Sequence, residues 1–402
     1  MGVSGFQHGP LSDLRVLELG TLLAGPFCGQ LLGDLGAEVI KIEAPGQGDP
    51  MRVWGLQKAG DPSLWWPVIA RNKKAITLDL RQAEGQALLL DLAAKSDFLL
   101  ENFRPGTLEK WNLGWERLHA VNPRLIMIRV SGYGQTGPYA ARAGFGAIGE
   151  AMGGLRHVVG DAGSPPARVG ISIGDSLAAT FACVGALAAL HHREQTGQGQ
   201  VVDSAIYEAV LGMMESLVTE YDKTGYIRER TGAILPNVAP SNVYPTGDGL
   251  VLIAANQDTV FRRLCAAMGE PALADDPAYA SHQARGARQA ELDARIARWT
   301  AGLPTAEVLG LMEEHGVPAG QIYRAPEMLA DPHFAAREAI VEVPHPQFGT
   351  IRMQNVVPKL SATPGGIRAP SPALGEHNDT VYLELLGLPR ERYAALKAAR
   401  VI

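Results

Sequence analysis

The sequence is poor in cysteine, in positive charge and in metal-binding patterns, and each shortage excludes a class of protein. Its three cysteines, Cys28, Cys183 and Cys265, lie far apart and form no Cys-x-x-Cys pair, so we expect neither a disulfide framework nor a zinc site. None of the ten histidines has the spacing of a ligand set such as His-Glu-x-x-His. We therefore predict no metal, and buried thiols in a reducing compartment.

Charge and apolar content describe a soluble, enzyme-sized protein. The net charge is −6 over 402 residues, so a nucleic-acid partner is not expected. Apolar residues make up 46% and charged residues 19% of the chain, which is typical of a globular protein long enough for two domains. The first residues lack the basic start and apolar core of a signal peptide. We therefore expect a cytoplasmic protein with no membrane partner.

The first half of the chain alternates strand and helix patterns. Such alternation predicts βαβ units, and hence an α/β fold with a parallel, doubly wound, Rossmann-like sheet. Ligands of such sheets bind outside the carboxyl ends of the strands. The predicted strands are 14–19, 38–42, 75–80, 97–100 and 125–130, and the predicted helices are 26–35, 82–95 and 116–120.

The second half predicts a smaller domain and a return to the first. A helix is expected around 204–221, and a segment rich in proline and glycine follows from 225 to 249. A compact α/β pattern, a hairpin, a linker and a terminal helix come next, at 250–315, 340–353, 361–372 and 380–388. We predict that 1–224 form the first part of a large domain, that 225–330 form linkers and a small α/β domain, and that 331–402 return to the large domain.

One long apolar stretch, residues 170–190, contains a single charged side chain, Asp175. From Ser176 onward it is apolar on every face, which predicts a helix buried in the core. Its glycine and alanine content and the charge near its start argue against a membrane span. A carboxylate at the start of a buried helix is kept ionised by the helix dipole. Asp175 is therefore either the N-cap of this helix or an anion that faces an adjoining cleft.

One expected motif is absent from the sequence, and two further clusters can each be interpreted in two ways. Gly20 and Gly25, after the first strand, lack the Gly-x-Gly-x-x-Gly spacing of a nicotinamide site. Basic residues gather in 71–81 and 101–110, where they form either a solvated surface or a site for phosphates and an adenine. The glycines of 131–139 either let a backbone approach a ligand or only form turns.

Taken together, the ordered motifs strongly resemble the class III CoA-transferases, the family of formyl-CoA transferase and carnitine CoA-transferase. The match runs nearly from end to end, and no single block is decisive. The motifs are Leu-Leu-Ala-Gly-Pro at 22–26, Gly-Ala-Glu-Val-Ile-Lys-Ile-Glu at 36–43, Gly-x-Gly-Asp at 46–49, Asn-Lys-Lys-Ala-Ile-Thr-Leu-Asp-Leu at 72–80, Glu-Asn-Phe-Arg-Pro-Gly at 101–106, Gly-Tyr-Gly-Gln-Thr-Gly-Pro-Tyr at 132–139, Gly-Asp at 174–175, Thr-Gly-Gln-Gly-Gln at 196–200, His-Gly-Val-Pro at 315–318, Asp-Pro-His at 331–333 and Leu-Gly-Glu-His at 374–377.

The resemblance implies a nucleophile, a CoA site and an assembly. Asp175 aligns with the family's nucleophilic aspartate, which forms an aspartyl anhydride and then an aspartyl-CoA thioester. CoA and acyl-CoA are substrates, no cofactor is permanently bound, and two subunits form an interlocked homodimer. The CoA-binding positions implied are Leu22, Leu23, Ala24, Leu78, Arg81, Asn102, Phe103, Arg104 and Lys110.

The sequence departs from the family pattern at three places. Ala44 and Pro45 stand where a basic residue often follows the Lys-Ile-Glu run. The run 235–244 lacks the glycines that cover the site of formyl-CoA transferase, which argues for another substrate. Residues 144–146 read Gly-Phe-Gly, without the proton-transfer histidine of the racemase branch. An acyl-CoA racemase or isomerase, and a non-catalytic CoA-binding protein, are the alternatives.

The substrates are expected to be small dicarboxylic acids, with succinyl-CoA as the donor. The run 237–246 resembles the succinyl-CoA:dicarboxylate branch of the family. Arg142 and Arg168 flank the expected site, and a guanidinium can bind a distal carboxylate in two-point fashion.

Overall fold

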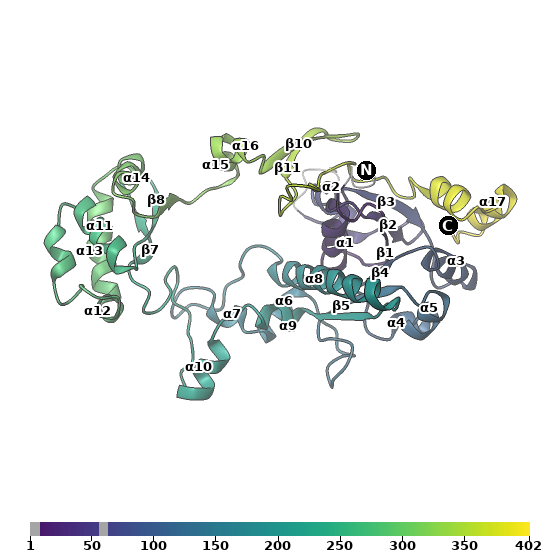
Figure 1. Ribbon diagram of the computed structural model, residues 1–402, viewed down its shortest axis with the longest axis horizontal. Coiled ribbons are helices and arrows are strands. Elements are labelled where there is room, and N and C mark those ends of the chain that lie inside the picture. Colours follow the sequence, from purple (N-terminus) through teal and green to yellow (C-terminus); the bar gives the residue numbers. More distant parts are fainter. Residues whose placement is uncertain (1–8, 56–62) are drawn as a thin grey trace. The chain divides into compact units, whose positions relative to one another are not determined.

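The structure is a computed structural model that describes residues 9–55 and 63–402 (Figure 1). The chain forms two compact units. Unit 1 comprises Met1–Arg156, Val169–Gly225 and Ala335–Ile402, and unit 2 comprises His157–Arg168 and Tyr226–Phe334. Residues 157–168, which the sequence interpretation gave to the large domain, thus group with the small unit.

Unit 1 is built on a six-stranded, fully parallel sheet in the order β3-β2-β1-β4-β5-β6. This is the doubly wound order, so the predicted α/β class is confirmed. β3 starts two residues earlier than predicted, because the charged Lys73 and Lys74 pair with Val39 and Ile40 of β2. The strands are β1 (Arg15–Glu18), β2 (Glu38–Glu43), β3 (Lys73–Thr77), β4 (Phe98–Glu101), β5 (Ile126–Ser131) and β6 (Val201–Ala205).

Helices α1 (Ala24–Asp34) and α8 (Ile173–Thr196) pack together on one face of the sheet (Figure 1). Glycines allow this close approach. A Cβ at Gly29 would lie 1.9 Å from the Glu18 carboxylate of β1, and one at Gly185 would lie 2.7 Å from Val202 of β6. A larger residue at either position would push its helix off the sheet.

The opposite face is covered by helices from both ends of the chain. Leucines and isoleucines of β1, β2 and β3 form one core there with residues of α3 (Ala83–Ala93), α5 (Trp115–Val121) and α17 (Arg390–Ala398). The predicted terminal helix is a wide, π-helical turn at Thr380–Leu385, and α17 after it was not predicted.

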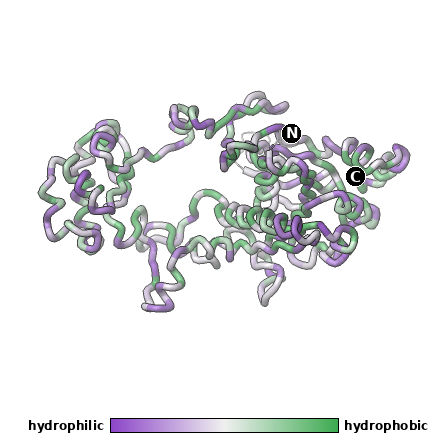
Figure 2. Tube along the Cα trace, viewed as in Figure 1, coloured by the Kyte–Doolittle hydropathy of each residue, from purple (hydrophilic) through white to green (hydrophobic). Residues whose placement is uncertain are grey.

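Helix α8 is only partly buried. It is long and apolar enough to cross a membrane by length and composition alone, and Figure 2 shows hydrophobic residues along it. Five of its six alanines, among them Ala178, Ala182 and Ala186, are buried, whereas Phe181 is 43% and Val184 58% exposed. The prediction that every face of this helix is buried is therefore wrong for the single chain, because only its narrow alanine side faces the core.

The helix predicted around 204–221 is interrupted. It forms α9 (Ile206–Leu211) and α10 (Leu217–Thr224), separated by a turn in which Glu215 adopts a φ of 52°. The predicted hairpin is confirmed as β10 (Ile340–His345) and β11 (Gly349–Gln354). The remaining elements of unit 1 are α2 (Trp66–Ile69), α4 (Thr107–Lys110), α6 (Gly146–Met152) and a 3₁₀ turn at Pro50–Arg52. Two short helices, α7 (Leu155–Val158) and α16 (Pro332–Ala336), each contain residues of both units.

Unit 2 has its own core around an antiparallel sheet. β7 (Ser241–Pro245) pairs with β8 (Leu250–Ala254), and β8 pairs with β9 (Ala319–Gln321). β7 lies inside the segment predicted to be a plain crossing, because Tyr244 is buried in this core and hydrogen-bonds to Asp293. The helices are α11 (Asp258–Ala267), α12 (His282–Ala287), α13 (Gln289–Ala301), α14 (Thr305–Glu314) and α15 (Ala325–Ala330), with a 3₁₀ turn at Pro271–Asp275.

Four charged side chains are buried together at the β1–β3 side of the sheet. Glu18 pairs with Lys41 at 3.0 Å and with Lys73 at 2.7 Å, and Lys41 also pairs with Asp49 at 2.8 Å. Each of these side chains is at most 1% exposed. Burial alone would lower the pKa of Lys41, but the nearby carboxylates outweigh burial and raise it. Two cations and two anions thus balance, and removing one leaves an uncompensated charge in the core.

Glu18→Gln is expected to lower the free energy of unfolding by about 3 kcal/mol or more, because both lysines stay buried. The matched control is Glu38→Gln, since Glu38 also binds two cations but is 29% exposed; its loss should cost about 1 kcal/mol or less. Urea denaturation at a fixed protein concentration measures both. Equal losses would contradict the account.

Candidate active site

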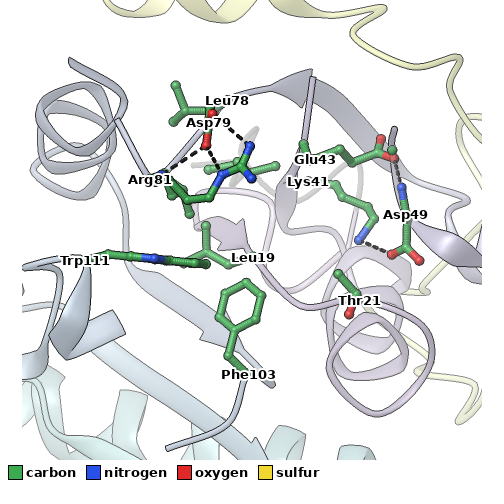
Figure 3. A pocket seen from close by; sticks show the side chains of 14 residues that line it. Leu19, Thr21, Lys41, Glu43, Asp49, Leu78, Asp79, Arg81, Phe103 and Trp111 are labelled. Carbon is green, nitrogen blue, oxygen red and sulfur yellow. Dashed lines mark hydrogen bonds and ion pairs between the residues drawn. The ribbon is translucent and has the colours of Figure 1, made fainter. Parts of the chain in front are cut away.

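A cavity opens at the carboxyl ends of β1, β2, β3 and β4 (Figure 3). It encloses about 140 Å³. This edge, beside the point where the strand order reverses, is where doubly wound sheets bind their ligands. The lining residues are Leu19, Thr21, Lys41, Ile42, Glu43, Ala44, Gly48, Asp49, Leu78, Asp79, Leu80, Arg81, Phe103 and Trp111.

Aromatic and charged groups face this cavity from different strands. The rings of Phe103 and Trp111 meet edge to face with centroids 5.4 Å apart, and Figure 3 shows both rings at the same side of the cavity. Arg81 binds Asp79 through its Nε at 2.8 Å and Nη2 at 3.0 Å. These hydrogen bonds lower the pKa of Asp79 to about 2. The cavity therefore combines a π surface with a fixed ion pair.

The structure brings together only some of the CoA-binding residues predicted from the resemblance. Leu78, Arg81 and Phe103 line the cavity. Asn102 is not among the lining residues, but it binds one of them: its side chain accepts from the N–H of Thr21 at 2.7 Å and donates to the carbonyl of Thr21 at 2.9 Å. Asn102 therefore shapes the turn after β1.

The other predicted positions are not among the lining residues of this cavity. Leu22 and Leu23 pack against the small cluster of Met51, Trp66, Ile69 and Ala70. Ala24 is the buried first residue of α1. Arg104 and Lys110 are exposed.

Sequence reasoning missed Asp49 and Trp111. Asp49 closes the Gly-x-Gly-Asp motif, and its Oδ1 accepts from the N–H of Leu22 at 3.0 Å. Leu22 has a φ of 63°, a left-handed conformation that costs a residue with a Cβ about 1–2 kcal/mol. Because Asp49 also pairs with Lys41, the buried charge network reaches the turn beside the cavity. The Gly-x-Gly-Asp motif pointed to Asp49, but its contacts with Lys41 and Leu22 could not be predicted from the spacing of residues.

Asp175 is the third residue of α8, and Ser172 occupies the N-cap position. The hypothesis that Asp175 is the N-cap is therefore wrong. Its carboxylate lies against the backbone of Gly146, the first residue of α6, because a Cβ there would lie 2.3 Å from Oδ2. The side chain is half-buried. A half-buried carboxylate in the first turn of a 24-residue helix faces the positive end of the helix dipole.

A second carboxylate supports the start of α8. Glu150 of α6 is fully buried and pairs with Arg156 at 2.8 Å. Its other oxygen accepts from the N–H of Gly174 at 3.4 Å. Gly174 is itself confined, since a Cβ there would lie 3.0 Å from the carbonyl oxygen of Gly146. The residue before Asp175 is thus held between two parts of α6.

The glycine-rich loop 131–139 lies close to this helix start. Gly132 packs directly on Gly144, two residues before Gly146, and a Cβ on Gly132 would lie 2.8 Å from its Cα. Farther along, the N–H of Gln135 donates to Asp203 at 2.9 Å. Arg142 stacks over the ring of Tyr139 at 3.6 Å. The loop therefore has the close backbone approach expected from its glycines.

Between Gly144 and Gly146, Phe145 is 69% exposed. No imidazole stands at this position beside Asp175. Across residues 9–55 and 63–402, His, Cys, Asp and Glu form no group suited to hold a metal ion. The three cysteines are free and buried.

Comparison with known proteins gives one consistent family. Residues 11–378 match the model of CoA-transferase family III. The chain is 64% identical over 394 residues to succinyl-CoA–D-citramalate CoA-transferase of Chloroflexus aurantiacus, covering 98% of both chains. It is 37% identical over 388 residues to succinate–glutarate CoA-transferase of Agrobacterium fabrum, covering 95% of this chain and 97% of that one.

A solved structure agrees with the sequence comparison. The CaiB/BaiF family protein of Brucella suis superposes with a TM-score of 0.83 at 34% identity, covering 94% of this chain and 100% of that one. The fold, the end-to-end match and the whole-length relatives lead to one conclusion: the chain belongs to CoA-transferase family III.

Proposed function

We propose that the protein transfers CoA from succinyl-CoA to a small dicarboxylic acid, with Asp175 as the covalent nucleophile. The observation that carries this proposal is the half-buried Asp175 carboxylate in the first turn of α8, against the bare backbone of Gly146. The names of the relatives, which act on citramalate and glutarate with succinyl-CoA or succinate, support the substrate class.

The reaction needs four acyl transfers at one carboxylate. An Asp175 oxygen attacks the thioester carbonyl of succinyl-CoA, the C–S bond breaks, and an aspartyl–succinyl anhydride and CoA thiolate form. The thiolate attacks the aspartyl carbonyl and releases succinate, which leaves an aspartyl-CoA thioester. The acceptor carboxylate attacks this thioester and again releases the thiolate. The thiolate then attacks the acceptor acyl carbon, which forms the new acyl-CoA and regenerates Asp175.

The surroundings of Asp175 suit this chemistry. Because Gly146 has no side chain, its backbone can lie against the carboxylate and fix it in place. The N–H groups in the first turn of α8 favour the negative charge of a tetrahedral intermediate. The pair of Glu150 and Arg156 holds Gly174 in place. No resident cofactor is needed, because CoA itself is the group that moves.

We place the nucleotide end of CoA in the cavity at the strand ends. Phe103 and Trp111 offer an adenine ring a π surface. Arg81 offers a guanidinium to the phosphates.

The alternatives of the same fold fit the site less well. An isomerase needs a base that removes the α-proton, and exposed Phe145 stands where the racemase branch has its histidine. A protein that only binds CoA has no use for a carboxylate at the start of α8. Buried, free thiols fit a reducing compartment, and we assign the protein to the cytoplasm.

Asp175→Asn is expected to leave a folded protein that binds CoA but transfers it at least about 1,000-fold more slowly, because the nucleophile is lost while size and polarity are kept. CoA exchange between succinyl-CoA and an acceptor acid, followed by mass spectrometry, measures this. With wild-type protein and succinyl-CoA alone, hydroxylamine should convert the activated carboxyl to a hydroxamate on the peptide that contains Asp175. Robust exchange by the variant, or a hydroxamate on another carboxylate, would overturn the mechanism.

Arg142→Met is expected to lower kcat/KM for dicarboxylate acceptors by about tenfold or more, because a guanidinium that binds the distal carboxylate is removed. Arg142 is exposed and stacked on Tyr139, so its loss should leave the fold intact. Monocarboxylate acceptors should be almost unaffected, as should the control Arg117→Met on the surface of α5. An equal loss with both classes of acid would remove Arg142 from acceptor recognition.

We further propose that the protein is a homodimer whose chains interlock. Exposed apolar side chains lie on α8, at Phe181 and Val184, and separately on α10, at Val218 and Tyr221, and exposed apolar patches mark protein contacts. Light scattering at low protein concentration should give about twice the chain mass of 42.8 kDa. A stable, active monomer would contradict the dimer.

A further inference from the structure

A second cavity adjoins the one that we assign to the CoA nucleotide. The two share Asp79 and Arg81. The second encloses about 600 Å³ and lies between the turn after β2 and the last residues of the chain. Its other lining residues are Pro45, Gly46, Gln82, Ala399, Arg400 and Ile402.

The segment that carries Arg400 is fixed along the turn that carries Arg81. The N–H of Asp79 donates to the carbonyl of Val401 at 2.8 Å, and the Gln82 side chain donates to the carbonyl of Arg400 at 3.3 Å. Val401 and Ile402 are buried in the main core. Because its neighbours are held on both sides, Arg400 stays at the cavity with a φ of 55°, and the two arginines flank the same space.

The charges around this cavity do not balance. Arg81 is bound to Asp79 through two hydrogen bonds, so these two charges offset each other. The guanidinium of Arg400 forms no ion pair or hydrogen bond within residues 9–55 and 63–402. On the other side, Pro45 and Gly46 carry no charge, and the space beside Gly46 is open. Among the side chains that line it, the cavity thus presents one cation without a partner, the guanidinium of Arg400.

We propose that Arg400 binds the 3′-phosphate on the ribose of CoA. The proposal rests on the CoA site assigned above. A nucleotide whose base lies near Trp111 and whose phosphates lie near Arg81 places its ribose toward the cavity that these residues share. The 3′-phosphate is a dianionic monoester, and a guanidinium matches it in charge and geometry. Arg400 supplies from the end of the chain the cation that Ala44 and Pro45 do not supply.

Binding of CoA and of 3′-dephospho-CoA tests this directly, because the two ligands differ only in that phosphate. Calorimetry on wild-type protein is expected to show CoA binding about tenfold more tightly, the effect of one charge-assisted contact. Arg400→Gln should bring the two affinities together by weakening CoA alone. Arg400→Lys should keep part of the difference. The control Arg392→Gln removes the same charge from exposed α17 and should leave the difference unchanged.

Three outcomes would overturn the assignment: wild-type protein that binds both ligands equally, an Arg400→Gln variant that keeps the tenfold difference, and a variant that weakens both ligands alike. Calorimetry requires no turnover, so these results are separate from the test of transfer. Protein that discriminates through Arg400 but exchanges no CoA would contradict the proposed reaction and leave Arg400 in place.

Discussion

The ion pairs of Glu18 with Lys41 and Lys73 are the constraint on which the strands beside the cavity depend. They join three neighbouring parallel strands inside the core, where a charge is stable only when it is paired. Through Asp49 the same network reaches the turn after β1 and holds Leu22 in a left-handed conformation. One set of ion pairs therefore connects three strands of the sheet with the turn beside the cavity.

The position of α8, the helix that carries Asp175, depends on a different constraint: the residues at its contacts must be small. Alanines and Gly185 let α8 lie close to α1 and β6. Gly146 and Gly174 let α6 approach the first turn of α8, so the carboxylate of Asp175 rests on backbone. Small residues thus position the Asp175 carboxylate by permitting close contact. The same narrow shape leaves Phe181 and Val184 exposed on the far side.

Five of the six strands of the parallel sheet and the longer helices could be predicted, because each is a local pattern of apolar residues. The errors have identifiable causes. The lysines that begin β3 look polar in sequence, yet ion pairs make them compatible with burial. The helix expected around 204–221 breaks where Glu215 takes a left-handed conformation, which local propensity does not favour. β7 was missed because it becomes a strand by pairing with β8, and this contact exists only in the folded chain.

The sequence by itself determined the fold class, the family and the single charged residue of the apolar helix, since all three follow from ordered local motifs. Only the tertiary structure decided that Asp175 lies within the first turn and not at the cap, and that its carboxylate rests against Gly146. Only it placed Trp111 and Asp49 at the cavity and brought Arg400 beside Arg81. These residues are dozens to hundreds of positions apart, and their proximity depends on how strands and chain ends pack, which residue spacing along the chain does not encode.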